Sequence, residues 1–305
     1  MKHILCWLLV LCGTSATACD VCGASGSSQG LGILPQFYRH FAGVQYQYRS
    51  FSSTHPGLIE QSAREHTQEQ YNTMQLWGRA NVGKRMQLFA FVPYMSNTRH
   101  FRERNATGSY HGLGDVSALA NVAIIKTPDS NRVRHMLLAG AGVKAPTGKR
   151  YSQNAQTDDG ILNIQPGTGS WDALLNANYT LRYALWGLNA EASYTLTTAN
   201  KEDYKYGNRL GTSLQAFYWL QAGSFTILPQ AGLRYEYTLH DYDNYTRKWL
   251  NEQTGGHMLF ATTGAQVYYK QFGLQFSYFI PVHQYYAAGY VTARQRVDAG
   301  IFFLF

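Results

Sequence analysis

The last fifteen residues alternate between apolar and polar side chains and end on an aromatic residue. They read VTARQRVDAGIFFLF, from Val291 to Phe305. Side chains on a β-strand point alternately to opposite faces, so this stretch is predicted to form a strand with one apolar face. The other face carries Arg294, Arg296 and Asp298. Such a strand fits a sheet with an apolar surrounding on one side and a polar one on the other.

This ending resembles the C-terminal signal of outer-membrane β-barrels, in which a terminal Phe and alternating apolar residues are read by the barrel-assembly machinery. The resemblance implies that Phe305 ends the strand that closes a barrel and that the assembly machinery is a partner of this strand. It also implies contact with the lipids of the outer membrane of a Gram-negative bacterium. The chain is therefore predicted to be all-β, a transmembrane antiparallel β-barrel.

The first 18 residues have the layout of a secretory signal peptide. Lys2 and His3 give a basic start, residues 4–11 an apolar core, and Ala16-Thr17-Ala18 a cleavage site. The apolar core is shorter than the roughly 20 residues of a transmembrane helix, and no later stretch approaches that length. We expect residues 1–18 to be removed, which lowers the formal charge from +8 to +7 because Lys2 leaves with them.

The composition is typical of a membrane barrel. Charged residues make up 14% of the chain, whereas soluble domains have roughly 25%. The chain also has 23 tyrosines and 29 glycines. Its mean hydropathy of −0.30 agrees with a barrel, because only half of the strand positions face lipid.

The alternation predicts about twelve strands, an even number as bacterial barrels require. The predicted segments are 40–51, 70–82, 86–97, 111–126, 133–146, 169–182, 186–198, 207–220, 224–238, 256–270, 272–283 and 290–305. Every second link is short, namely 83–85, 127–132, 183–185, 221–223 and Gln271. The other links are mostly long and polar: 52–69, 98–110, 147–168, 199–206, 239–255 and the shorter 284–289. This asymmetry predicts short periplasmic turns, long outer loops and two periplasmic termini.

In most of the predicted strands, the odd- and even-numbered residues differ in polarity, and this parity indicates which side chains face outward and which face inward. In the seventh segment, the even-numbered residues from Leu188 to Leu196 are leucine, alanine and tyrosine and are predicted to face outward. Asn189, Glu191 and Ser193 are predicted to face inward. The third segment, MQLFAFVPYMSN, is apolar on both faces, and parity does not orient it. Aromatic girdles at the membrane interfaces are expected from Tyr46, Tyr48, Trp171, Tyr179, Tyr194, Tyr235, Tyr237 and Tyr269.

Two cysteines stand at the start of the exported chain. Cys19 and Cys22 form a C-x-x-C pair in a Gly/Ser-rich tail, residues 19–39, that precedes the barrel of residues 40–305. A disulfide, a metal-binding thiol pair and lipidation of Cys19 all remain open. Copper or zinc would find only two soft ligands there. No other cofactor is expected.

The fourth segment opens with Gly112-Leu113-Gly114-Asp115. No helix pattern follows, so a dinucleotide-binding loop is excluded. Glycine at both positions favours a site where the strand bends or a loop folds against the wall. Together with Val143-Lys144-Ala145-Pro146-Thr147-Gly148, this motif resembles the outer-membrane proteins grouped as transporters of the phenol meta-degradation pathway, the MetA-type family. That resemblance implies a passive outer-membrane channel for a small-molecule solute.

Parity places nine basic and five acidic side chains inside the barrel. They are Arg49, Arg79, Arg134, Lys144, Arg182, Arg209, Arg234, Arg294 and Arg296, with Asp115, Asp172, Glu191, Glu236 and Asp298. One interpretation is a network of ion pairs that props or fills the barrel. The other is a basic pore wall that favours small polar or anionic solutes, since charged rings set selectivity in pores.

Two further function classes are excluded. No nucleophile elbow or paired-acid signature occurs, so no enzyme is expected. The bases alternate with apolar residues and form no continuous patch, so no nucleic-acid partner is expected. The alternative to a channel is a non-conducting barrel that serves as a scaffold, or as a metal- or redox-responsive accessory through its cysteine-containing tail.

Overall fold

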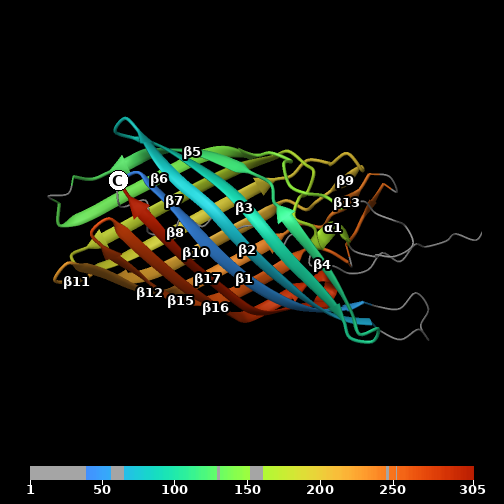
Figure 1. The fold of residues 1–305 in the computed structure, drawn as a ribbon. Coiled ribbons are helices and arrows are strands. Elements are labelled where there is room, and N and C mark those ends of the chain that lie inside the picture. The colour runs from blue at the N-terminus through green and yellow to red at the C-terminus, as the bar shows by residue number, and fades with distance from the viewer. Residues whose placement is uncertain (1–38, 56–64, 129–130, 152–160, 245–246, 252) are drawn as a thin grey trace, which may run out of the picture.

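The computed structural model describes residues 39–55, 65–128, 131–151, 161–244, 247–251 and 253–305. In this part of the chain twelve antiparallel strands close into a barrel (Figure 1). They are β1 (Phe41–His55), β2 (Glu65–Val82), β3 (Met86–Phe101), β5 (Ser117–Lys126), β6 (Val133–Lys144), β7 (Asp172–Tyr183), β8 (Trp186–Leu196), β10 (Arg209–Tyr218), β12 (Phe225–Thr238), β15 (Gly256–Tyr269), β16 (Phe272–Tyr286) and β17 (Val291–Leu304). Two short strands extend the wall, β4 (Ala106–Leu113) along β3 and β11 (Leu220–Ala222) along β12.

The last strand closes the barrel, as predicted. β17 pairs with β16 on one side and with β1 on the other, where Phe41 faces Leu304. The Phe305 N–H donates to the His40 carbonyl at 2.9 Å, and the two rings stack at 5.7 Å. Each of the twelve strands therefore has a partner strand on both sides, as a barrel in lipid requires. The prediction of an all-β, twelve-stranded barrel is confirmed.

The two ends of the barrel differ. One end, called here the turn end, carries the short links predicted from the sequence, and both His40 and Phe305 lie there (Figure 1). Gly83 and Gly223 sit in two of these turns with φ of 62° and 59°, where glycine has no Cβ to clash. The opposite end, the loop end, carries the long links.

Side chains alternate between the two faces of the wall as the sequence predicts. Leu188, Leu214 and Leu233 are about half exposed on the outside, at 45%, 53% and 51%. Their neighbours Asn189 and Arg234 are buried inside. The structure also orients β3: Phe89 and Phe91 point inward into an apolar layer, which is why both faces of this strand are apolar. No helix among the described residues is long and apolar enough to cross a membrane.

The links at the loop end depart from the prediction of plain outer loops. β2 starts at Glu65 and β3 runs to Phe101, so residues expected in loops 52–69 and 98–110 extend the wall. The links 199–206 and 239–255 form a small sheet of β9 (Tyr204–Lys205), β13 (Tyr242–Asp243) and β14 (Lys248–Trp249). The link after β6 contains α1 (Ile161–Ile164) and folds inward. A 3-10 turn, η2 (Ala287–Gly289), joins β16 to β17.

The predicted fourth strand is broken at residues 114–116, between β4 and β5. The start of the next link lies against this break, because the Ala145 N–H donates to the Val116 carbonyl and the Lys149 N–H to that of Leu113. A Cβ on Gly112 would lie 2.7 Å from the Lys149 side chain. The expectation that a loop folds against the wall at these glycines therefore agrees with the geometry.

A β-bulge between β1 and β17 changes which side chains face inward. Arg49 pairs with Arg296, but Phe51 pairs with Ala293, so two residues of β17 oppose Ser50 alone. The extra residue reverses the alternation, since a shift of one position moves a side chain to the other face. Arg294, placed inside by parity, is exposed and donates from Nε to Ser52 Oγ at 3.3 Å.

Candidate functional site

The interior at the turn end is filled by an apolar cluster, here called the aromatic layer. Its buried members are Phe41, Trp77, Phe89, Phe91, Leu119, Leu174, Phe217, Leu228, Tyr268, Phe302 and Leu304. Trp77 meets the edge of Phe41 at 4.5 Å between ring centroids. Gly187 and Gly273 leave room for rings, since a Cβ there would lie 2.1 Å from Phe217 and Phe302. Apolar side chains therefore occupy much of the described interior at this end, together with buried polar side chains such as Gln87, Asn121 and Asn189.

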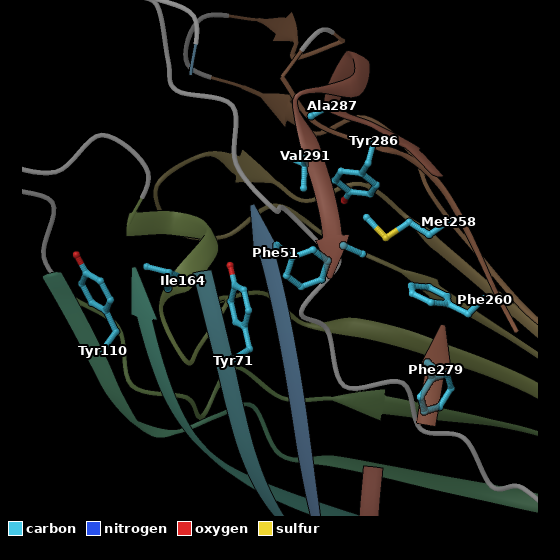
Figure 2. Packing of buried hydrophobic residues seen from close by; sticks show 11 residues of the cluster. Phe51, Tyr71, Tyr110, Ile164, Met258, Phe260, Phe279, Tyr286, Ala287 and Val291 are labelled. Carbon is cyan, nitrogen blue, oxygen red and sulfur yellow. The ribbon is translucent and has the colours of Figure 1, made fainter. Parts of the chain in front are cut away.

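A second apolar cluster lies inside the loop end (Figure 2). It joins residues of the wall to Ile164 of the inward-folded link, and comprises Phe51, Tyr71, Tyr110, Ile164, Met258, Phe260, Phe279, Tyr286, Ala287, Val291 and Ala293. The Asn97 side chain donates to the Ile164 carbonyl at 2.6 Å, and the Tyr71 hydroxyl to that of Asn163 at 3.4 Å. These contacts hold α1 within the mouth of the barrel.

Charged side chains lie between the two clusters. Arg234 and Arg296 both contact one oxygen of Glu236, at 2.6 and 2.7 Å. The guanidinium of Arg296 also lies over the Phe279 ring at 4.1 Å. Arg49 donates to Gln47 at 3.2 Å, and Glu191 is buried on the same inner surface. This part of the interior is a network of ion pairs of the kind that props a barrel.

Asp115 joins the two sequence motifs into one junction. Its carboxylate contacts Lys144 Nζ at 3.1 Å and accepts from the Gly148 N–H at 2.9 Å. Lys144 also contacts Asp172 at 2.6 Å, so one ammonium lies between two buried carboxylates. The Thr168 N–H and hydroxyl both donate to Asp115, at 2.9 and 2.6 Å. The junction therefore fastens both described ends of the inward-folded link, near residues 148 and 168, to the wall.

A cavity of about 150 Å³ lies in the lumen beside this junction. Its polar lining includes Lys144 with its two aspartates, Asn176, Ser193, Thr195, Arg209, and the Arg234–Glu236 pair. Its apolar lining includes Met95, Leu119, Leu174 and Met258. This volume is enough for several waters or a small solute.

Arg209 stands apart from the other bases of the cavity. Its Nε has no hydrogen-bond partner among the described residues, and within that part of the chain no carboxylate lies at ion-pair distance. Both polar atoms of the Asn176 side chain are buried and without a partner there as well. Two polar groups that line one cavity thus have hydrogen-bonding capacity that the described chain does not use.

The remaining predicted interior residues lie elsewhere. Arg79 is buried at the turn end, where Nε and Nη2 donate to the Arg39 carbonyl at 3.1 and 2.7 Å. Arg182 lies over the Trp219 ring at 3.9 Å near the same end, and Arg134 is half-buried opposite it in the pairing of β6 and β7. Asp298 lies 3.7 Å from Arg296.

Sequence reasoning missed one buried pair. Arg99 and Glu69, 3.5 Å apart and 1% and 0% exposed, were placed in outer loops because their strands were expected to be shorter. Cys19, Cys22 and the predicted signal peptide lie outside the described residues. In the part of the chain that is described, no group of three His, Cys, Asp or Glu side chains gathers to hold a metal ion.

The fold has clear likenesses among solved structures. An outer-membrane channel from Pseudomonas putida F1 superposes with a TM-score of 0.64 and 16% identity, over 88% of this chain and 95% of that one. The β domain of the Bordetella autotransporter BrkA superposes with a TM-score of 0.50 and 11% identity, over 88% of this chain and 100% of that one. The transport unit of the Escherichia coli autotransporter AIDA-I superposes with a TM-score of 0.50 and 9% identity, over 90% of this chain and 93% of that one. No protein-family model and no curated protein sequence matches the chain. At these identities the likeness establishes the fold: a closed, twelve-stranded outer-membrane β-barrel of the Gram-negative type, with an apolar outer surface that faces lipid.

Proposed function

We propose that the protein is an outer-membrane channel through which small polar or anionic solutes move passively. The observation that carries the proposal is the cavity inside the lumen. Arg209 lines this cavity and has no carboxylate partner among the described residues. Barrels of about eight strands are filled by side chains and those of 16 leave wide pores, so twelve strands leave a narrow path. The turn end, with both described chain ends, faces the periplasm in this proposal.

The P. putida protein is described as a channel, which favours the same general activity here. The short motifs joined at Asp115 extend the resemblance to the transporters of the phenol meta-degradation pathway. They support a small organic solute as cargo, without naming it.

A non-conducting scaffold is the second candidate, and the aromatic layer favours it. Buried rings occupy the described interior at the turn end, and a solute that crosses the barrel would have to pass them. A Trp77→Ala, Phe217→Ala variant would remove two of these rings and widen the path.

Planar bilayers distinguish the two candidates. The channel predicts reproducible conductance steps, a reversal potential that favours anions under a salt gradient, and a larger conductance in the double variant. Bilayers that stay silent with the wild-type protein and also with the double variant would reject the channel and support the scaffold. Heat-modifiable migration in gels serves as the control that each preparation is folded.

A further inference from the structure

We propose that Arg209 and Thr195 form a binding subsite for a small organic carboxylate, with the apolar part of the ligand on the neighbouring leucines and methionine. This inference rests on the proposed function and names a substrate class for the same cavity. It starts from the one base in the cavity lining that the described residues leave without a carboxylate partner.

The carboxylates of the cavity are already engaged. Asp115 and Asp172 share Lys144, at 3.1 and 2.6 Å. Glu236 accepts from Arg234 and Arg296, at 2.6 and 2.7 Å. The three bases and three acids of the lining balance in formal charge, but Arg209 is the base that has no carboxylate at ion-pair distance among the described residues. A guanidinium in that position favours an anion, and its planar fork matches a carboxylate.

The register places a second donor beside Arg209. Arg209 on β10 pairs directly with Thr195 on β8, and both side chains face the cavity. Directly paired residues of adjacent strands have Cβ atoms about 5 Å apart, so one carboxylate can accept from the guanidinium and from the threonine hydroxyl. Asn176 lies two strands from Arg209 on the same inner surface, where its amide offers the next polar contact.

The rest of the lining selects an organic anion over an inorganic one. Leu174 pairs with Thr195 across β7 and β8, and its buried side chain lines the cavity together with Leu119 and Met258. These side chains offer an apolar surface next to the donors. A carboxylate with a short hydrocarbon chain gains from both, whereas phosphate or acetate gains only from the charge.

Calorimetric titration of the purified full-length protein in detergent tests the subsite, with sodium hexanoate as the probe. We expect hexanoate to bind, and acetate and the neutral hexanamide to bind at least about tenfold more weakly, because each lacks one of the two contacts. Arg209→Gln should weaken hexanoate binding by about tenfold or more, and Thr195→Val by several-fold. Arg294→Gln removes the same charge at an exposed position and serves as the matched control, with binding unchanged.

Several outcomes would overturn the subsite: hexanoate that does not bind, equal binding of hexanamide, or full binding in the Arg209→Gln variant. Each variant is first shown to be folded by heat-modifiable migration; if Arg209→Gln fails to assemble, Arg209→Lys replaces it and should still lose affinity because the fork is lost. Failure of the proposed function is separate. Conductance with no Arg209-dependent binding would reject only the subsite, and Arg209-dependent binding in a barrel that stays silent would reject only the channel.

Discussion

The Lys144 ammonium lies 3.1 Å from the Asp115 carboxylate, and this contact links two motifs that are 29 positions apart in the chain. Asp115 stands at the break between β4 and β5, and Lys144 ends β6. The same carboxylate accepts from Gly148 and Thr168, so the inward-folded link and the wall share one anchor. One residue from each of the two sequence motifs, Asp115 and Lys144, thus lines the cavity.

Loss of the Asp115 anchor should destabilise the barrel far more than loss of an exposed ion pair. Asp115→Asn removes a buried carboxylate and leaves the half-buried Lys144 with one carboxylate, and we expect a cost of about 3 kcal/mol. Glu65→Gln removes the partner of Arg104, which is 58% exposed, and should cost less than about 1 kcal/mol. Urea unfolding in lipid vesicles measures both. Equal losses in the two variants would contradict the assigned role of the junction.

Assembly should depend on the last three residues. Deleting Phe303 to Phe305 removes the Phe305 contact with His40 and the Leu304 pairing with Phe41, so the seam between β17 and β1 loses its turn end. We expect the amount of heat-modifiable protein in the outer membrane to fall sharply. A conservative variant, Phe303→Leu, keeps the apolar face and should assemble normally. If the truncated chain assembles as well as the parent, the C-terminal strand is not the assembly signal.

The tip of the β3–β4 hairpin should respond to acid. The Glu103 carboxylate accepts from the backbone N–H of His66 at 2.9 Å and contacts its ring at 2.7 Å, and these hydrogen bonds lower the Glu103 pKa to about 2. A carboxyl group whose pKa is lower in the folded state than in the unfolded state stabilises the fold when the pH is above the unfolded-state pKa. This contribution is lost as the pH falls through the folded-state pKa. The contribution of this contact to stability should therefore be lost between pH 4.5 and 2.

Carbon-13 NMR of the Glu103 carboxyl carbon measures this titration. We expect a midpoint near pH 2 in the wild type. His66→Pro removes the backbone donor, which is the largest cause of the lowered pKa, and should raise the midpoint. A midpoint that does not move in this variant would show that the N–H contact is absent.

The cysteine tail is predicted to modulate the barrel without being needed for its fold. A Cys19→Ser, Cys22→Ser double variant, exported by a signal peptide independent of Cys19, should assemble in normal amounts. We expect it to lose copper or zinc binding, or its response to reductant, because a thiol pair supplies the soft ligands. If it equals the parent in metal binding, in conductance and in response to reductant, the tail is only a linker.

The alternation of side chains was enough to predict the wall of this protein. Period-two patterning depends only on neighbours along the strand, so the strand number, the short turns and the inward position of Arg209, Arg234 and Glu236 follow from the sequence. The contact between Glu236 and Arg296 was not predictable, because Arg296 lies on another strand, 60 positions away in the chain.

Three further features depend on tertiary structure. The bulge opposite Ser50 reverses the face of Arg294, and nothing local in VTARQR marks where the extra residue falls. Phe89 and Phe91 have an apolar inner surface to pack against only once other strands bring Trp77 and Leu119 beside them. The link with α1 folds inward because Asp115 and Asn97, both far away in the chain, supply its hydrogen bonds. Each outcome is decided by partners that only barrel closure brings together, whereas the strands themselves are decided by alternation along the chain.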